Sequence, residues 1–288
     1  NDIFVKILLN GLTGGHSGAE IHKGLGNSNK ILFKIINELN LNFEIKIGSI
    51  IGGGLRNAIP RESSIIISFA KENLNSFDKI ISNFSQTLAD EFNQTDPNLN
   101  LEYNLLDDRI EILDITDSNR LICAVNECPN GVFEMSKNID GLVETSNNLA
   151  NIQLTEGVLK IQCLTRSSSD NSKEQLSNII SNIFENIGCD CRFSGGYPGW
   201  EPNFKSATLK KVKDSYLKLF SSNPKVNVIH AGLECGIIGS HYPEMDMISF
   251  GPTILGAHSP DEKASISSTQ KFWKFFKEIL SNIPEKVS

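Results

Sequence analysis

The sequence predicts an α/β protein built in two parts, and three observations support this fold class. Strand and helix patterns follow the order β-α-β-β-α-β through about residue 105, which is typical of a ferredoxin-like sandwich. Similar patterns recur at about 130–195 as a partial repeat. After the bend SGGYPGWEPN at 194–203, the pattern becomes that of the end of an α/β domain. We therefore expect one domain over 1–195 and another over 196–288.

The elements of the first part follow from hydrophobic periodicity and from turn residues. Residues 3–9 alternate as in a strand, and the glycine-rich loop 11–18 leads to a helix that begins near Asn27 and Ser28. The apolar face of this helix consists of Ile31, Leu32, Ile35, Ile36 and Leu39. Next come two strands expected to pair as a hairpin across GGGLRNAIPRE, then a helix and a strand, at 43–51, 63–70, about 74–93 and about 99–105.

The remaining elements are less regular but can still be placed. The partial repeat has strand patterns at 131–136, 141–165 and 189–194, with an amphipathic helix at 171–187 between the last two. The second part is expected to contain two helices and two strands, at 205–221, 225–230, 246–250 and about 262–282. Loops after strands are where α/β folds usually place their functional sites.

Composition and charge exclude several classes of function. No apolar run approaches the roughly 18–20 residues that a membrane-spanning helix needs. The formal net charge of −7, with dispersed lysines and arginines, argues against nucleic acid as a partner. The cysteines form no CxxC pair, which suits reduced packing residues in the cytoplasm better than disulfides or a cysteine-ligated zinc. The chain begins at Asn1 and enters a strand almost at once, so we expect a further N-terminal part.

Two glycine-rich stretches carry candidate functional residues. In GGHSGAEIH, His16 follows a strand in a loop where the backbone can approach a ligand closely. Taken alone, the histidine could equally cap the next element of structure. In GGGLRNAIPRE, Arg56, Asn57 and Arg61 lie at a hairpin bend, where solvated side chains are the simplest interpretation.

Later stretches add further candidates. Arg166 ends the apolar strand in KIQCLTRSSSD, and a guanidinium there can bind a carboxylate through two hydrogen bonds, although a solvated arginine is more common. Glu234 lies in HAGLECGIIGSH, whose spacings match no standard zinc helix such as HExxH. His258 lies in GPTILGAHSPDEK, and a single histidine is more often a structural residue than a metal ligand.

Together, six stretches resemble the aminoacyl-histidine dipeptidases (Xaa-His dipeptidases, peptidase D), which belong to the co-catalytic zinc peptidases along with carnosinases, aminoacylases and carboxypeptidase G. The stretches are GGHSGAEIHKGLGN, GGGLRNAIPRE, NGVFEMSKNIDGLVETSNNLA, GWEPN, HAGLECGIIG and ISFGPTILGAHSPDEK. The resemblance covers essentially the whole chain. It implies a ferredoxin-like, partly doubled lid domain joined to the C-terminal half of an α/β catalytic domain.

The resemblance also implies roles for individual residues. His258 matches a zinc ligand, and His16 matches a lid histidine that reaches the substrate, commonly across a dimer interface, and stabilises the oxyanion. Arg166 matches the arginine that holds the substrate's C-terminal carboxylate. The amide that contacts the substrate matches Asn57 or Asn148, with Asn147 as the neighbouring alternative to Asn148. Glu234 and Thr253 lie in stretches that flank the site in this family.

The chain also departs from the family pattern. Enzymes of this family carry an HxD stretch, a bridging aspartate, a Glu-Glu pair with the general base and a further aspartate before the lid, and none of these is found here. Of the usual ligands for two zinc ions only His258 remains, and one imidazole cannot hold a catalytic zinc. We therefore expect a parent enzyme that hydrolyses Xaa-His dipeptides such as carnosine, with two Zn²⁺ per site, while this chain alone is inactive.

The parent is expected to be a cytoplasmic homodimer that contacts through the lid, with a dipeptide substrate and without nucleic-acid or membrane partners. Two alternatives stay open. The chain could be a catalytically dead module that dimerises or binds peptides. It could also come from another amide hydrolase of the superfamily, such as an aminoacylase, although the doubled lid and the AGLECG stretch disfavour this.

Overall fold

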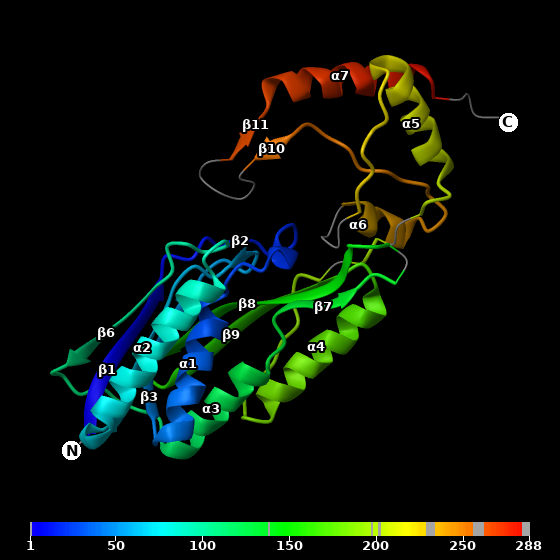
Figure 1. Cartoon of the computed structure of the whole chain (residues 1–288). Coiled ribbons are helices and arrows are strands. Elements are labelled where there is room, and N and C mark those ends of the chain that lie inside the picture. Colours follow the sequence, from blue (N-terminus) through cyan, green and yellow to red (C-terminus); the bar gives the residue numbers. More distant parts are fainter. Residues whose placement is uncertain are drawn as a thin grey trace. The chain divides into compact units, whose positions relative to one another are not determined.

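The structure is a computed structural model that describes residues 2–137, 139–196, 198–200, 203–228, 234–255 and 262–283 (Figure 1). The chain divides into two compact units. The first unit comprises the chain through Gly196, and the second comprises most of the residues after it. None of the helices in these described ranges is both long and apolar enough to cross a membrane.

A seven-stranded sheet forms the first unit, and its first four strands confirm the predicted ferredoxin-like order. These strands are β1 (Asp2–Asn10), β3 (Lys46–Gly53), β5 (Ser63–Ala70) and β6 (Asn100–Leu106). They lie in the order β6-β1-β5-β3, and each neighbouring pair is antiparallel. Ile50 of β3 is opposite Ile65 of β5, so the pairing expected between 43–51 and 63–70 is confirmed.

Helices α1 (Ser28–Asn42) and α2 (Leu74–Glu91) complete this sandwich and cover one face of the sheet (Figure 1). Helix α1 begins where the sequence predicts, because the side chain of Asn27 accepts a hydrogen bond from the backbone N–H of Lys30 at 3.2 Å. Its predicted apolar face is buried against inward side chains of the central strands, such as Ile7 and Ile65. This packing is the main core of the molecule.

The partial repeat extends the same sheet. It consists of α3 (Ile115–Glu127), β7 (Gly131–Met135), β8 (Val143–Thr155), β9 (Val158–Ser167) and α4 (Asp170–Glu185). Strand β8 pairs with β3, β7 and β9. The stretch predicted as strand at 141–165 is therefore a hairpin, and its turn residues Glu156 and Gly157 both have positive φ angles, of 52° and 72°.

Two expectations for this region were wrong or incomplete. Residues 189–194 do not form a strand, because the chain turns at the end of α4, where Cys189 N donates to Phe184 O at 3.1 Å, and no described strand pairs with this segment. Helix α3 was not predicted. Asp114 marks its start, since its carboxylate accepts a hydrogen bond from Asp117 N at 2.8 Å.

The second unit contains α5 (Ala207–Phe220), α6 (Glu234–His241), β10 (Ile254–Leu255), β11 (Lys263–Ala264) and α7 (Ile266–Ser281). Helices α5 and α7 agree with the prediction, and Tyr216 packs edge-on against Phe275 with ring centroids 5.2 Å apart. The predicted strands are wrong at 225–228 and 246–250, which have no strand partner among the described residues. Residues 229 and 230 lie outside the described part.

Candidate functional site

The two glycine-rich stretches of the first unit meet in a short two-stranded ribbon. Strand β2 (Gly15–His16) pairs antiparallel with β4 (Ala58–Ile59), and His16 is directly opposite Ala58. We call this pair the β2–β4 ribbon. Next to it, the backbone N–H of Ser17 donates to the backbone oxygen of Asn57 at 2.8 Å. The structure thus brings together His16 and Asn57, which come from two separate stretches of the sequence.

The imidazole of His16 is held by the backbone that follows it. Its Nδ1 accepts hydrogen bonds from the backbone N–H groups of Gly18 and Ala19, each at 3.1 Å. An acceptor nitrogen carries no proton, so the neutral ring must carry its proton on Nε2. The residue is half-buried. The local backbone therefore fixes both the orientation of the ring and its tautomer, with Nε2 as a donor.

Arg166 lies beside this histidine. It is at the end of β9, opposite Ser146 of β8, and is only 9% exposed. Its buried Nε has no hydrogen-bond partner among the described residues. A Cβ atom placed on Gly18 would lie 3.1 Å from His16 Cε1 and 3.3 Å from Arg166 Nε, so the two side chains are close neighbours across this glycine. A side chain at position 18 would fill the space between them.

The asparagines are placed differently from one another. Asn57 is half-buried in the turn before β4. Asn148 is buried, and its Nδ2 donates to the backbone oxygens of Arg56 and Ala58 at 3.1 and 2.8 Å. Asn147 is also buried and donates to Pro129 O at 2.6 Å. The roles proposed for these side chains in contacting a substrate stay predictions.

The other predicted site residues belong to the second unit. Glu234 is the first residue of α6 and is exposed. Thr253 is exposed too, and its backbone N–H donates to Ser268 Oγ at 2.9 Å. His258, the expected zinc ligand, lies outside the described residues, as does the expected cleft beside it. Their roles likewise stay predictions.

The described residues do not themselves supply a metal site. Within the ranges that the structure describes, no three His, Cys, Asp or Glu side chains are grouped so that they could hold a metal ion. The donors near His16 are a backbone-bound imidazole, a guanidinium and amides, and a guanidinium cannot ligate a cation. Among the described residues, the His16 and Arg166 side chains therefore offer hydrogen-bond donors that suit an anionic or carbonyl group.

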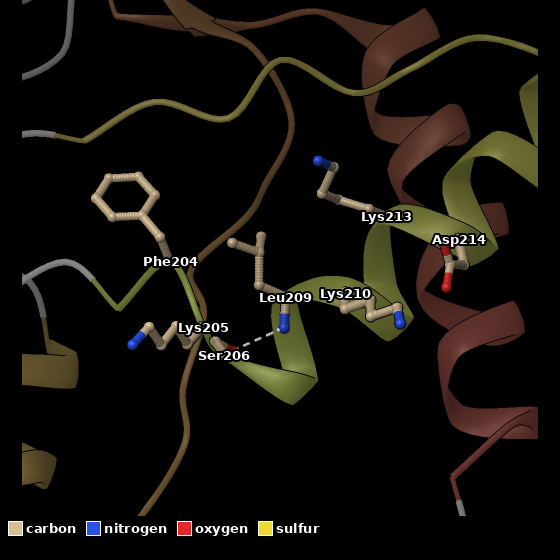
Figure 2. Close-up of a pocket in the computed structure, with 7 residues that line it drawn as sticks. All are labelled: Phe204, Lys205, Ser206, Leu209, Lys210, Lys213 and Asp214. Carbon is tan, nitrogen blue, oxygen red and sulfur yellow. Dashed lines mark hydrogen bonds between the residues drawn. The ribbon is translucent and has the colours of Figure 1, made fainter.

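The second unit contains a pocket. Figure 2 shows it at the start of α5, where Ser206 Oγ accepts a hydrogen bond from Leu209 N at 2.8 Å. It is lined by Phe204, Lys205, Ser206, Leu209, Lys210, Lys213 and Asp214. The three lysines are exposed, and the pocket contains none of the predicted site residues, so we assign no function to it.

Two acidic residues that sequence reasoning missed support the backbone around His16. Glu20 accepts hydrogen bonds from the backbone N–H of His16 at 2.9 Å and from Lys23 Nζ at 2.8 Å. The Lys23 side chain, followed by the His16 N–H, lowers the pKa of the Glu20 carboxyl. Asp96 is buried and accepts from the backbone of the loop on both sides of His16.

Only Glu20 had a local signal, because it lies four residues after the histidine. Asp96 is distant in sequence from the backbone groups that it binds, and its position near the end of α2 gave no indication of this role.

Part of the first unit is similar to a known family of peptidase domains. Residues 7–96 match the family model described as "Peptidase dimerisation domain". This stretch includes the end of the first strand, the His16 loop, the first hairpin and helices α1 and α2. The first unit therefore contains a segment that is similar to a peptidase dimerisation domain, and the α/β fold class predicted from the sequence is confirmed.

Particular relatives extend the similarity to the whole chain. The chain is 37% identical over 281 residues to the Cytosol non-specific dipeptidase of Escherichia coli (strain K12), a match that covers 98% of this chain and 58% of that protein. It is also 37% identical to the Aminoacylhistidine Dipeptidase from Vibrio alginolyticus, with a TM-score of 0.88 over 99% of this chain and 58% of that one. The resemblance to the aminoacyl-histidine dipeptidases is confirmed, and the chain spans about 58% of the length of these relatives.

Proposed function

We propose that the full-length protein containing this chain hydrolyses dipeptides, with a preference for Xaa-His substrates such as carnosine. One observation carries the proposal: the buried Arg166 presents an unpartnered Nε next to His16, with Gly18 leaving space between them. A dipeptide offers a carboxylate and, a short distance from it, the carbonyl of its single peptide bond. The names of both relatives, each a dipeptidase, support the same substrate class.

In this proposal, Arg166 binds the C-terminal carboxylate of the substrate. A buried guanidinium with an unused donor is costly unless a ligand satisfies it, and a carboxylate is the ligand whose geometry matches best. The position of Arg166 at the end of β9, within a hydrogen-bonded sheet, makes it a rigid binding group. Fixing one end of a small substrate also positions its peptide bond.

His16 is proposed to donate a hydrogen bond from Nε2 to the carbonyl oxygen of the scissile bond. Its Nδ1 is occupied by two backbone donors, so the ring needs no rearrangement to act as a donor. A donor fixed in this way stabilises the oxyanion that forms during amide hydrolysis. Asn57, whose backbone is bonded to Ser17, is proposed as an amide that contacts the substrate, and Glu234 and Thr253 are proposed to flank the site.

Metal dependence is part of the proposal through His258 and the family resemblance, with two Zn²⁺ per site. The described residues do not form a metal site, so no catalytic step is assigned to a metal. We propose that the other ligands and the general base belong to a part of the full-length protein outside residues 1–288. The 288-residue chain alone is then expected not to hydrolyse dipeptides.

Assembly and location complete the proposal. The description of the family model that matches residues 7–96 supports a homodimer formed through the first unit. The word "cytosol" in the name of the Escherichia coli relative supports a cytoplasmic location.

The test uses the full-length protein and two forms of one substrate, a free-acid Xaa-His dipeptide and its C-terminal amide. Replacing Arg166 with alanine should lower kcat/KM for the free acid. The decrease should correspond to a loss of about 2–5 kcal/mol in binding free energy, the cost of removing one partner of a buried charge pair. The loss for the amide should be much smaller. The control is Arg192→Ala, because Arg192 is exposed and, among the described residues, pairs with Asp190 at the surface, at 2.7 Å.

The second variant of the test is His16→Ala, which should lower kcat about 100- to 1000-fold for both substrate forms, as expected for loss of an oxyanion donor. Equal losses for free acid and amide in the Arg166 variant would contradict the carboxylate role. Faster turnover of N-acyl amino acids than of dipeptides would favour the aminoacylase alternative. Dipeptide binding by the full-length protein without turnover would favour the peptide-binding alternative.

A further inference from the structure

The side chain of Asn148 uses both of its N–H groups on the polypeptide backbone. It is 1% exposed. Its Nδ2 donates to Arg56 O at 3.1 Å and to Ala58 O at 2.8 Å. A primary amide has only two donors. The amide therefore has no donor left for a substrate, although the sequence analysis had considered it as a substrate contact.

The two carbonyls that Asn148 binds belong to the turn and strand that hold His16. Ala58 is the residue directly opposite His16 in the β2–β4 ribbon. Asn148 itself lies on β8, which pairs with β9, and its partner there is Leu164, two residues before Arg166. One buried amide thus connects the ribbon that holds His16 to the strand pair that holds Arg166.

The orientation of the Asn148 amide is fixed from the other side by Asn27. The Nδ2 of Asn27 donates to Asn130 Oδ1 at 3.0 Å, to Leu149 O at 3.2 Å and to Asn148 Oδ1 at 3.3 Å, so its two N–H groups are shared among three acceptors. The Oδ1 of Asn27 is already used to cap α1 through Lys30 N. The Asn27 amide can therefore face Asn148 only with its N–H groups, which places the N–H groups of Asn148 toward the ribbon.

We infer that Asn148 is a positioning residue, which sets the separation of His16 from Arg166 rather than touching the substrate. This inference rests on the roles proposed above for those two residues. His16 can donate a hydrogen bond to the substrate carbonyl only if Arg166 holds the substrate carboxylate at a matching distance from His16. A shift of the β2–β4 ribbon changes this distance and therefore lowers turnover. The polar side chain is needed because its site presents two carbonyl oxygens, which an apolar side chain of the same size would leave unsatisfied.

The neighbouring Asn147 provides a matched control. It is equally buried, at 1% exposure, and its Nδ2 also donates to a backbone carbonyl, Pro129 O at 2.6 Å. Its Oδ1 accepts a hydrogen bond from Thr165 Oγ1 at 3.3 Å. Successive residues of a strand point to opposite faces, so Asn147 faces away from the ribbon. Substituting either asparagine with aspartate puts an acceptor opposite a carbonyl, but only at Asn148 is that carbonyl part of the ribbon.

The experiment compares Asn148→Asp with Asn147→Asp in the full-length protein. Two quantities are measured: the ¹⁵N chemical shifts of the His16 imidazole, assigned by their loss in His16→Gln, and kcat for a free-acid dipeptide. We expect Asn148→Asp to change the His16 shifts and to lower kcat about 10- to 100-fold, as for a displaced catalytic group. Asn147→Asp should leave the His16 shifts as in the unsubstituted protein. Equal effects of the two variants on the His16 shifts would overturn the inference.

A second pair, Asn148→Ser and Asn147→Ser, keeps the test decisive if the aspartate variants do not fold, and it adds no charge near Arg166. Serine keeps one donor but is too short to bridge both carbonyls. Unchanged His16 shifts in Asn148→Ser would again overturn the inference. The imidazole signal does not depend on turnover. A fully active His16→Ala enzyme would therefore refute the proposed function, whereas the shifts would still decide the role of Asn148.

Discussion

A single buried carboxylate, Asp96, is predicted to hold the loop that carries His16. Its Oδ1 accepts the backbone N–H of Thr13 at 2.8 Å, and its Oδ2 accepts the backbone N–H of Gly26 at 2.9 Å. The side chain is 1% exposed. These two hydrogen bonds anchor both ends of the segment from Thr13 to Gly26 on the Asp96 side chain. The substitution Asp96→Asn keeps the shape of the side chain and changes only its charge and one of its acceptors.

The expected loss of stability follows from these two bonds. A hydrogen bond to a charged group contributes about 1.5–3 kcal/mol, and a buried donor left without a partner costs about 1–3 kcal/mol. In Asp96→Asn one oxygen still accepts, while the NH₂ group faces a backbone N–H. The neutral amide is easier to bury than a carboxylate, which offsets part of the loss. We expect a net decrease in the free energy of unfolding of about 2–4 kcal/mol.

The assay is urea denaturation followed by circular dichroism, combined with hydrogen exchange at the backbone amides of Thr13 and Gly26. The control is Asp90→Asn on the exposed surface of α2, where the carboxylate accepts from Gln86 Nε2 at 3.2 and 3.3 Å, and the change should stay within about 0.5 kcal/mol. Equal stability of the two variants, with unchanged exchange at both amides, would refute the idea that Asp96 holds the loop.

Three further predictions concern the scaffold of the first unit. Gly53→Ala should destabilise by about 2 kcal/mol or more in urea denaturation, because Gly53 has a φ of 73° and a Cβ there would lie 1.9 Å from Ala150 O. Lys30→Met should cost about 1–3 kcal/mol in the same assay, because the Lys30 ammonium donates to three carbonyls at the end of α3. The pKa of the Glu20 carboxyl is lowered in the folded protein. Its hydrogen bond from the His16 N–H is therefore fully formed above pH 4.5, the ordinary pKa, and is lost as the pH falls through the lowered pKa of the folded state. The amide proton shift of His16 should report that titration below pH 4.5, and Glu20→Gln should abolish it.

The fold of the first unit was predictable where periodicity and local caps agreed. Strand alternation in β1, β3 and β5 and the 3.6-residue pattern of α1 gave the ferredoxin-like order, because each element buries one face. Helix α3 was missed although Asp114 caps it, because its first half is polar and its apolar residues are concentrated in one short run at 121–125 instead of recurring at helical spacing. The strands expected at 225–230 and 246–250 are absent over the described residues 225–228 and 246–250 for another reason. An apolar run becomes a strand only when a neighbouring strand satisfies its backbone, and sequence does not reveal that neighbour.

The candidate site was predictable only in part, for a comparable reason. His16 and Arg166 were found through the family resemblance, while their proximity across Gly18 depends on a contact between segments far apart in the chain. The supporting bonds are also long-range: Asp96 lies 83 residues from Thr13. A buried carboxylate in the loop after a helix has no periodicity that reveals its partner, so its role is visible only in three dimensions.

The hydrogen bonding around His16 bears on the proposed role of Arg166. The backbone of this region is well satisfied, since Asp96, Glu20 and Asn148 each accept from or donate to it. Buried polar groups normally find partners, and an unsatisfied donor on a charged group is the costliest exception. In the described residues Arg166 Nε is the charged member of the buried groups that lack a partner. A scaffold that orders its backbone so completely, yet leaves one buried guanidinium nitrogen without a partner among the described residues beside a fixed imidazole, supports the proposal that Arg166 binds a carboxylate of the substrate.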